Sequence, residues 1–396
     1  MSGALDGVKV VDVSAVMSGP LAATILADQG ADVIKVEPPM LGDILRHLGS
    51  NKNGMSGMFH VANRGKRSVV LDLRQDEGIA LLRELAADAD VFIQNFRPGV
   101  ADRMGIGFEE LSAGNPGLVY CSISGFGSEG PYSGQRVYDN VIQVYSGLAD
   151  IQGDPMSGEP QLHRQLLCDK LTSVTAASAI ASALYARETG RGGQHIDLAM
   201  LDAAIAFHWP DSGADHTLLD DDVAHQPTIG SNYSLMAFAD GWGTATPLSD
   251  SEFRGWCKAY GREDIADDER FSTLPARMAN LPAFLEVAAE VGAVAETMPK
   301  EEAAAKMAAE DVPSGIVRTI DELHEDPQVV HNEVFVEREH PLAGRLREPR
   351  PAARFSATPA APGGPAPALG QHTDEVLAEL GHGDRIADLR ERGIVA

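Results

Sequence analysis

Basic residues are scarce in this chain of 396 residues. It contains 32 Lys and Arg residues against 58 Asp and Glu residues, which gives a formal net charge of −26. A surface of that sign repels nucleic acid and anionic membranes, so we expect neither as a partner. The same charge also keeps a protein in solution, and solubility alone is enough to explain it.

Cysteine is rarer still, with only Cys121, Cys168 and Cys257. None of them lies in a CxxC pair or in a Cys/His cluster with metal-ligand spacing, so we expect neither a disulfide framework nor a metal site. No apolar run approaches the length that spans a membrane. The opening MSGALDGVKVVDVS lacks the basic and apolar regions of a signal peptide. We therefore expect a cytoplasmic protein.

Several catalytic motifs are missing as well. The turn Met17-Ser18-Gly19-Pro20 stands where a dinucleotide-binding protein carries GxGxxG. Without those glycines, Glu37 at the end of the next predicted strand does not indicate NAD binding. The sequence also has no HExxH, GxSxG or Walker A motif, which argues against a zinc protease, a serine hydrolase and a nucleotide hydrolase.

Apolar strands that alternate with helices dominate the first half of the chain. Strands are predicted at residues 8–13, 31–36, 67–73, 90–95, 118–124 and 194–198, and helices at 21–29, 77–87 and 170–187. Such alternation predicts an α/β fold with a doubly wound parallel sheet.

The composition changes near Asp211, where an acidic stretch begins. Beyond it, the turn at Asp240-Gly241 lies between aromatic-rich runs and predicts a hairpin within residues 233–246. Residues 250–323 have a helical pattern, and we assign residues 225–325 to a smaller α+β domain. Short strands near 335–339 and 344–347, a Pro-rich linker at 357–367 and a helix at 373–380 follow.

Asp169 directly precedes the predicted helix of small residues at 170–187. Aspartate is among the best N-cap residues, so capping alone explains its position. The positive end of a helix also keeps a carboxylate ionised, which suits a nucleophile. The spacing does not decide between the two.

Basic and amide residues cluster in an otherwise acidic chain, in segments that lie beside the predicted strands. They are found in the segments 63–67, 95–97, 103 and 136–138. Because open sheets bind ligands at the carboxyl ends of their strands, these residues are candidates for one site. The alternative is a set of separate, solvated side chains.

Long segments of the chain also match one family in order. They read VVDVSAVMSGPLAATILADQGADVIKVEPP, NRGKRSVVLDLR, NFRPGVADRMGIGFEELSAGNPGLVYCSISGFGSEGPY and DKLTSVTAASAIASALYARETGRGGQHIDLAMLDA. Over essentially its whole length the chain resembles the class III CoA-transferases of the carnitine dehydratase and bile-acid-inducible type. Formyl-CoA transferases and α-methylacyl-CoA racemases belong to the same family.

The resemblance implies a fold and an assembly. The large domain would be Rossmann-like and built from both chain ends, with residues 1–210 as its first part and residues 326–396 returning to it. Residues 225–325 would form the small domain. Two such chains would interlock as a homodimer.

The resemblance also implies a site and a reaction. Asp169 would be the nucleophile that moves CoA from an acyl-CoA to a carboxylic acid, through an aspartyl anhydride and an aspartyl-CoA thioester. The CoA thioester is itself the substrate, and no other cofactor is implied. The CoA-binding residues would be Val16, Met17, Lys66, Arg67, Asn95, Phe96, Arg97, Arg103, Arg136 and Tyr138.

Departures from the family pattern narrow the range of activities that we expect. Met17 stands where the formyl-CoA transferases have Gln, Pro38 stands near their Arg, and residues 224–246 lack their glycine run. Formyl or oxalyl transfer is therefore not expected. The racemases place a His where this chain has Tyr138, and a phenol with a pKa of about 10 is a poor base. Racemisation is the alternative activity. A third hypothesis is a nonenzymatic acyl-CoA-binding protein, and the presence of Asp169 argues against it.

Overall fold

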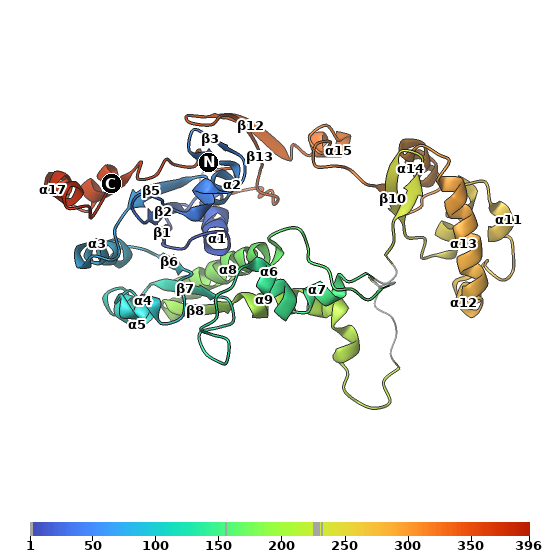
Figure 1. The fold of residues 1–396 in the computed structure, drawn as a ribbon, viewed down its shortest axis with the longest axis horizontal. Coiled ribbons are helices and arrows are strands. Elements are labelled where there is room, and N and C mark those ends of the chain that lie inside the picture. The colour runs from blue at the N-terminus through green and yellow to red at the C-terminus, as the bar shows by residue number, and fades with distance from the viewer. Residues whose placement is uncertain (1–2, 155–156, 225–229, 231–232) are drawn as a thin grey trace. The chain divides into compact units, whose positions relative to one another are not determined.

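The computed structural model describes residues 3–154, 157–224, 230 and 233–396, and the chain divides into two compact units (Figure 1). The first unit comprises Met1–Pro210 and His331–Ala396, and the second comprises Asp211–Val330. No helix in the described part of the chain is long and apolar enough to cross a bilayer.

A parallel six-stranded sheet forms the centre of the first unit, with strand order β5-β2-β1-β6-β7-β8. The strands are β1 (Lys9–Asp12), β2 (Asp32–Glu37), β5 (Lys66–Val70), β6 (Val91–Gln94), β7 (Val119–Ser124) and β8 (Gln194–Ala199). All neighbouring pairs run parallel. This confirms the predicted α/β fold with a parallel sheet, which follows from β-branched runs that are buried on both faces.

Alternate residues of the strands pack against helices on opposite faces of the sheet. Val10 belongs to a core with α1 (Ser18–Ala27) and α8 (Leu167–Ala186), whereas Val11 belongs to a core with α3 (Asp76–Ala87). Small buried residues such as Ala22 and Ala176 let α1 and α8 approach closely. Figure 1 shows α8 beside α1.

Helix α1 begins earlier than predicted. The expected turn at Ser18–Pro20 is the first turn of the helix. Proline is accepted there because its missing N–H lies among the groups that have no partner within the helix. This places the N–H of Ser18 at the start of α1, beside the sheet edge that carries the site.

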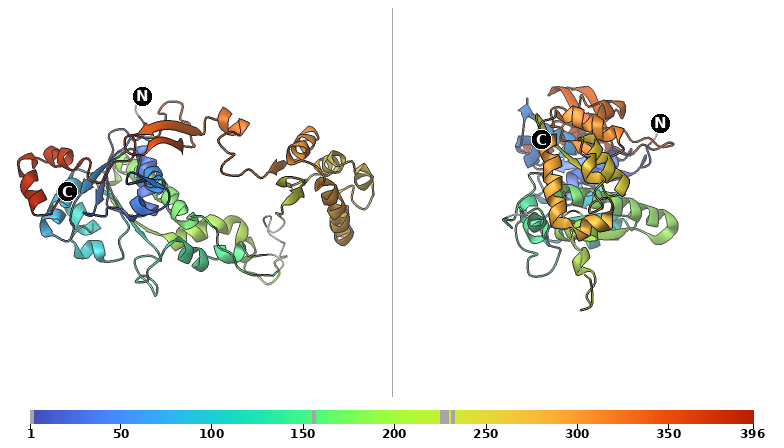
Figure 2. Two further views of the ribbon diagram at one scale, coloured as in Figure 1. Left: turned by 45° about the horizontal axis from the view of Figure 1, so that its top comes forward. Right: turned by 90° about the vertical axis from the view of Figure 1, so that its right-hand side faces the viewer.

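The C-terminal segment completes the first unit. The N–H of His372 donates to the carbonyl of Ser68 at 2.9 Å, and the N–H of Val70 donates to the Thr373 hydroxyl at 3.1 Å. Helix α16 (Thr373–Glu379) therefore covers β5, and α17 (Ile386–Glu391) closes the same core. Figure 2 shows this red segment beside the blue N-terminal strands.

Shorter elements connect these parts. They are η1 (Ile44–His47), β3 (Asn51–Lys52), β4 (Met55–Ser56), α2 (Gly57–Asn63), α4 (Val100–Arg103), α5 (Phe108–Gly114), α6 (Asp139–Tyr145), α7 (Leu148–Ile151), η2 (Arg187–Arg191), β12 (Phe335–His340), β13 (Gly344–Pro349) and η5 (Gly383–Arg385). Helix α9 (Met200–Ser212) follows β8. Strands β12 and β13 pair antiparallel.

The second unit has a three-stranded sheet in the order β11-β10-β9 and its own core of buried residues, including Phe253, Trp256 and Phe271. Strands β9 (Met236–Phe238) and β10 (Gly241–Ala245) pair antiparallel, which confirms the predicted hairpin. The remaining elements, at or beside this unit, are η3 (Ala214–His216), α10 (Asp250–Ala259), α11 (Glu263–Ala266), α12 (Leu274–Ala279), α13 (Leu281–Ala295), α14 (Lys300–Ala309), β11 (Ser314–Ile316) and α15 (Pro327–His331).

Candidate active site

A cavity of about 370 Å³ opens where strands β1, β6 and β7 end. The chain runs outward from β1 through β2 to β5 on one side, and from β6 through β7 to β8 on the other. The cavity thus lies at the switch point between β1 and β6, where open α/β sheets bind ligands. Its lining comprises Ala15, Val16, Ser18, Asn95–Pro98, Ile123–Gly125, Ser133, Gln135–Tyr138, Asp169 and Met200.

The carboxylate of Asp169 lies in this cavity and is only 8% exposed. Helix α8 begins at Leu167 with Leu166 as its N-cap, so Asp169 occupies the first turn and is not the cap. The N-cap interpretation of this residue was therefore wrong. The start of the helix was mispredicted because its N-cap, Leu166, has no side chain that can cap and makes no side-chain capping bond.

The pKa of Asp169 is raised to about 7, chiefly by burial and secondly by the negative charge of Asp139. The backbone N–H of Ser18, which lines the same cavity, acts in the opposite direction and lowers this pKa. Part of the population is therefore protonated near neutral pH, and the ionised form is poorly stabilised by solvent.

Asp139 supports the helix that carries Asp169. One of its oxygens, Oδ1, accepts the backbone N–H of Asp169 at 2.9 Å, and the other, Oδ2, accepts Nε2 of Gln143 at 2.6 Å. Gln143 in turn accepts the N–H of His163 at 2.9 Å and donates to the carbonyl of Gln165 at 3.1 Å. These bonds fix the segment that leads into α8.

Seven of the predicted site residues line the one cavity. They are Val16, Asn95, Phe96, Arg97, Arg136, Tyr138 and Asp169. Met17 precedes α1 as its N-cap and packs against the buried cluster that includes Leu45 and Phe59. Arg103 lines an adjoining open cavity of about 470 Å³, which Arg97 shares.

Lys66 and Arg67 are not brought to this cavity. The Lys66 ammonium is fully buried and donates to Asp12 at 2.8 Å, to Asn63 at 2.9 Å and to the carbonyl of Pro20 at 2.7 Å. These bonds use all three of its donors. The resemblance implies that Lys66 and Arg67 contact the adenosine phosphates of CoA, and this stays a prediction. For Lys66 the hydrogen bonds give that contact no support.

Arg67 is engaged within the protein as well. Its guanidinium donates to both oxygens of Asp32, at 3.1 and 2.7 Å, and to Glu379 at 2.9 Å. A phosphate would have to displace these carboxylates.

Sequence reasoning missed several cavity residues, including Ser124, Gly125, Gln135 and Met200. Ser124 and Gly125 come directly at the end of a predicted strand, and that position was the one signal available. Asp139 was not among the predicted site residues, and its bond to Asp169 joins residues 30 positions apart. Among the described residues, no group of three or more His, Cys, Asp or Glu side chains is arranged to hold a metal ion.

Comparison with known proteins connects this geometry to one kind of chemistry. The family model described as CoA-transferase family III matches residues 5–373. The sequence is 37% identical over 390 residues to the succinate–glutarate CoA-transferase of Agrobacterium fabrum, with 95% of each chain covered. It is 32% identical over 402 residues to the human succinyl-CoA:glutarate CoA-transferase, covering 99% of this chain and 90% of that one.

A solved structure has the same fold. The crystal structure of a CAIB/BAIF family protein from Brucella suis superposes with a TM-score of 0.83 at 34% identity, covering 96% of this chain and all of the other.

Proposed function

Because this chain belongs to CoA-transferase family III, we propose that it moves CoA from an acyl-CoA donor to a carboxylic acid acceptor with the Asp169 carboxylate as nucleophile. The observation that carries the proposal is one buried carboxylate in a cavity at the sheet switch point. We propose that the predicted CoA-binding residues that line this cavity with Asp169 contact the CoA thioester.

The proposed reaction needs no oxidant and no net proton transfer. A carboxylate oxygen of Asp169 attacks the donor thioester carbonyl, and the C–S bond breaks to release CoA thiolate and leave a mixed anhydride. The thiolate then attacks the Asp169 acyl carbon, which releases the donor acid and forms an aspartyl-CoA thioester. The acceptor carboxylate attacks that thioester and releases thiolate. The thiolate finally takes the acceptor acyl group and frees the Asp169 carboxylate.

The electrostatics of Asp169 favour such acylated states. Burial and the charge of Asp139 both disfavour the free carboxylate, as its pKa of about 7 records. Acylation makes Asp169 neutral, so it relieves both penalties at once. Ser18 lines the cavity with Asp169, and its N–H is the candidate donor to the oxyanion of each tetrahedral step.

We propose dicarboxylic acids such as succinate and glutarate as the first acceptors to examine. The two curated relatives described above are named for these acids. Arg97 and Arg136 line the cavity with Asp169. A guanidinium binds a carboxylate with two parallel hydrogen bonds, so either residue suits the remote carboxylate of such a substrate.

The test is a screen of carboxylic acids with succinyl-CoA and acetyl-CoA, read by mass spectrometry of the CoA products. Asp169→Ala should abolish transfer while the protein still binds CoA. Asp202→Ala is the matched control, because Asp202 also lies in the first turn of a helix but is exposed and outside the cavity. Hydroxylamine trapping after incubation with acyl-CoA should label Asp169 in the wild type. Near wild-type turnover by Asp169→Ala would rule out the nucleophile.

Racemase chemistry is separated by a second assay. The cavity-lining residues in the described part of the chain include no histidine, and Tyr138 is 72% exposed. Exchange of an α-proton needs a base with a pKa near the working pH. A 2-methylacyl-CoA incubated in deuterated water without acceptor should therefore stay free of deuterium. Rapid incorporation that depends on Asp169 would favour a racemase instead.

We also propose an interlocked homodimer. Apolar side chains are exposed along α8 and α9, including Val174 at 61%, Tyr185 at 72% and Phe207 at 59%. Exposed apolar groups of this size on long helices are typical of a covered interface. Sedimentation of the dilute protein should give a dimer, and a folded monomer would contradict the proposal.

A further inference from the structure

The segment that faces Asp169 contains an unusual backbone conformation. Val16 has a φ of 69°, in the left-handed region that β-branched residues rarely adopt. Val16 lines the cavity together with Asp169, and so does Ser18 two positions later. Such a conformation persists only where its surroundings hold it.

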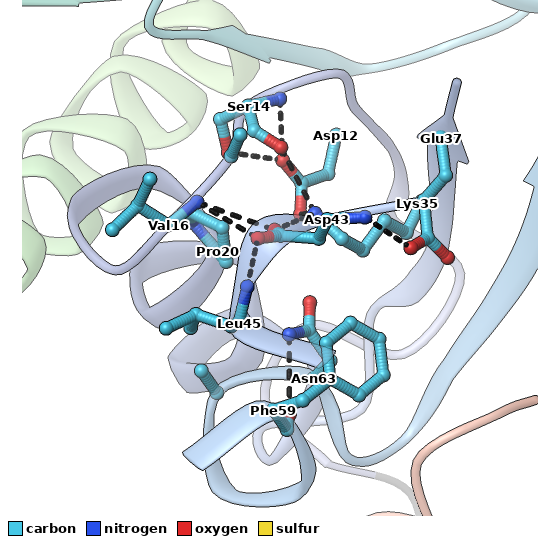
Figure 3. A network of polar contacts seen from close by, with 12 residues as sticks. Asp12, Ser14, Val16, Pro20, Lys35, Glu37, Asp43, Leu45, Phe59 and Asn63 are labelled. Atoms are coloured by element: carbon cyan, nitrogen blue, oxygen red, sulfur yellow. Dashed lines mark hydrogen bonds and ion pairs between the residues drawn. The ribbon is translucent and has the colours of Figure 1, made fainter. Parts of the chain in front are cut away.

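A buried carboxylate holds Val16 directly. The N–H of Val16 lies 3.2 Å from each oxygen of Asp43. That carboxylate is fixed in turn by the ammonium of Lys35 at 3.1 Å and by the N–H of Leu45 at 2.9 Å. Asp43 is 2% exposed and Lys35 is fully buried. Figure 3 shows Asp43 at the centre of these contacts.

The residues before Val16 are held as tightly. The side-chain amide of Asn95 binds both backbone polar groups of Ala15. Its Oδ1 accepts the N–H of Ala15 at 2.8 Å, and its Nδ2 donates to the carbonyl of Ala15 at 2.7 Å. Lys35 also donates to the carbonyl of Ser14 at 2.9 Å. Consecutive peptide groups from Ser14 to Val16 are thus bound by side chains from neighbouring strands and loops.

The simplest explanation of these contacts is structural, with Asp43 and Lys35 as members of a buried ion cluster. Their arrangement argues for more, because the Asp43 carboxylate binds the one residue of this segment whose conformation is unfavourable. Releasing Val16 would let its φ return to negative values and would rotate the peptide groups that follow. Ser18, which lines the cavity with Asp169, belongs to the part that would move.

We infer that Asp43 and Asn95 are positioning residues that hold Val16 in its left-handed conformation and thereby keep Ser18, at the start of α1, in place beside Asp169 in the cavity. This inference rests on the proposed function, because the geometry that it protects is that of the nucleophile. Neither side chain acts on the substrate in this role.

The decisive experiment measures coupling to Val16. Val16 lines the cavity, so Val16→Gly serves only as a reference background with a kcat of its own. Because glycine adopts a positive φ without strain, that background should depend less on the clamp formed by Asp43 and Asn95. In the wild-type background, Asp43→Asn and Asn95→Ala should each lower kcat by about a hundredfold, the loss expected from a misplaced reacting group. In the Val16→Gly background the same changes should lower kcat by less than about tenfold relative to Val16→Gly alone. KM should stay nearly constant in Asp43→Asn, because Asp43 does not line the cavity.

Thr24→Val is the matched control. Its hydroxyl is buried in α1 and donates to the carbonyl of Ala62, away from the 14–18 segment. It should lower thermal stability, leave kcat unchanged and show no coupling to Val16. An equal loss of kcat in both backgrounds, or an unchanged kcat in Asp43→Asn, would overturn the inference. If Asp43→Asn does not fold, Asn95→Ala decides the question by itself.

A second readout is independent of activity. Amide hydrogen exchange of the peptide that covers residues 13–19 should rise in Asp43→Asn and Asn95→Ala and stay unchanged in Thr24→Val. Absence of CoA transfer by the wild type would refute the proposed function. The exchange data would still show whether Asp43 and Asn95 hold the segment in place. Unchanged exchange in both clamp variants would refute the clamp while leaving the proposed function intact.

Discussion

Replacing Asp169 with asparagine should stabilise the protein at alkaline pH. The native pKa of about 7 lies about three units above the ordinary value of 3.8, with burial as the main cause and Asp139 as the second. Each unit corresponds to roughly 1.4 kcal/mol, so the folded state at pH 8 carries a penalty of up to about 4 kcal/mol for ionising this group. Asparagine has the same shape and no charge, and it removes the penalty.

The sign of the pH dependence follows from the same pKa. Below about pH 4 the carboxyl is protonated in both the folded and the unfolded chain, and the raised pKa has no effect on stability. Between pH 4 and pH 7 the unfolded chain loses the proton while the folded protein retains it, so stability falls as pH rises. Above pH 7 both forms are ionised and the full penalty is present.

Urea denaturation at pH 5 and pH 8 measures the effect. The free energy of unfolding of Asp169→Asn should exceed that of the wild type by more at pH 8 than at pH 5. Asp202→Asn, at an exposed position in the first turn of α9, should show no such difference. A variant no more stable than the wild type at pH 8 would show that the site does not penalise the charge, and the electrostatic argument for acylation would fail with it.

Three further changes are expected to have defined effects. Asp139→Asn removes the second cause of the raised Asp169 pKa, so the acidic limb of kcat/KM should move to lower pH. Gly19→Ala puts a Cβ 2.2 Å from Oγ of Ser14 and should lower kcat at least tenfold, with a stability loss of about 1–3 kcal/mol by thermal denaturation. Gly65→Ala forces a side chain to a φ of 74° and should cost about 1–2 kcal/mol of stability without changing kcat.

The sheet could be predicted because its information is local. Each strand is a short apolar run, and its order in the chain follows from the alternation with helices. The start of α8 could not be predicted, because Leu166 carries no capping signal and the residues before Asp169 look like a connector. The turn predicted before α1 failed for a related reason, since proline fits the first turn of a helix as well as a loop.

The site was predictable only where residues follow strand ends. Asn95, Phe96 and Arg97 met that condition and line the cavity. Lys66 is instead the first residue of β5, and its side chain binds Asp12, which lies 54 positions earlier. Spacing does not reveal whether a lysine faces solvent or a buried acid.

The division of the large unit between both chain ends has a consequence for synthesis. The face of the sheet that includes Val11 packs against Val376 and Leu389, more than 360 positions later. At roughly 5–20 residues per second, the ribosome needs on the order of 20–70 seconds to deliver that cover. Throughout this time the first strands must keep an apolar face open, beside a growing chain that contains a second core of its own. The cell therefore makes the part that carries the active site first and can complete it only last.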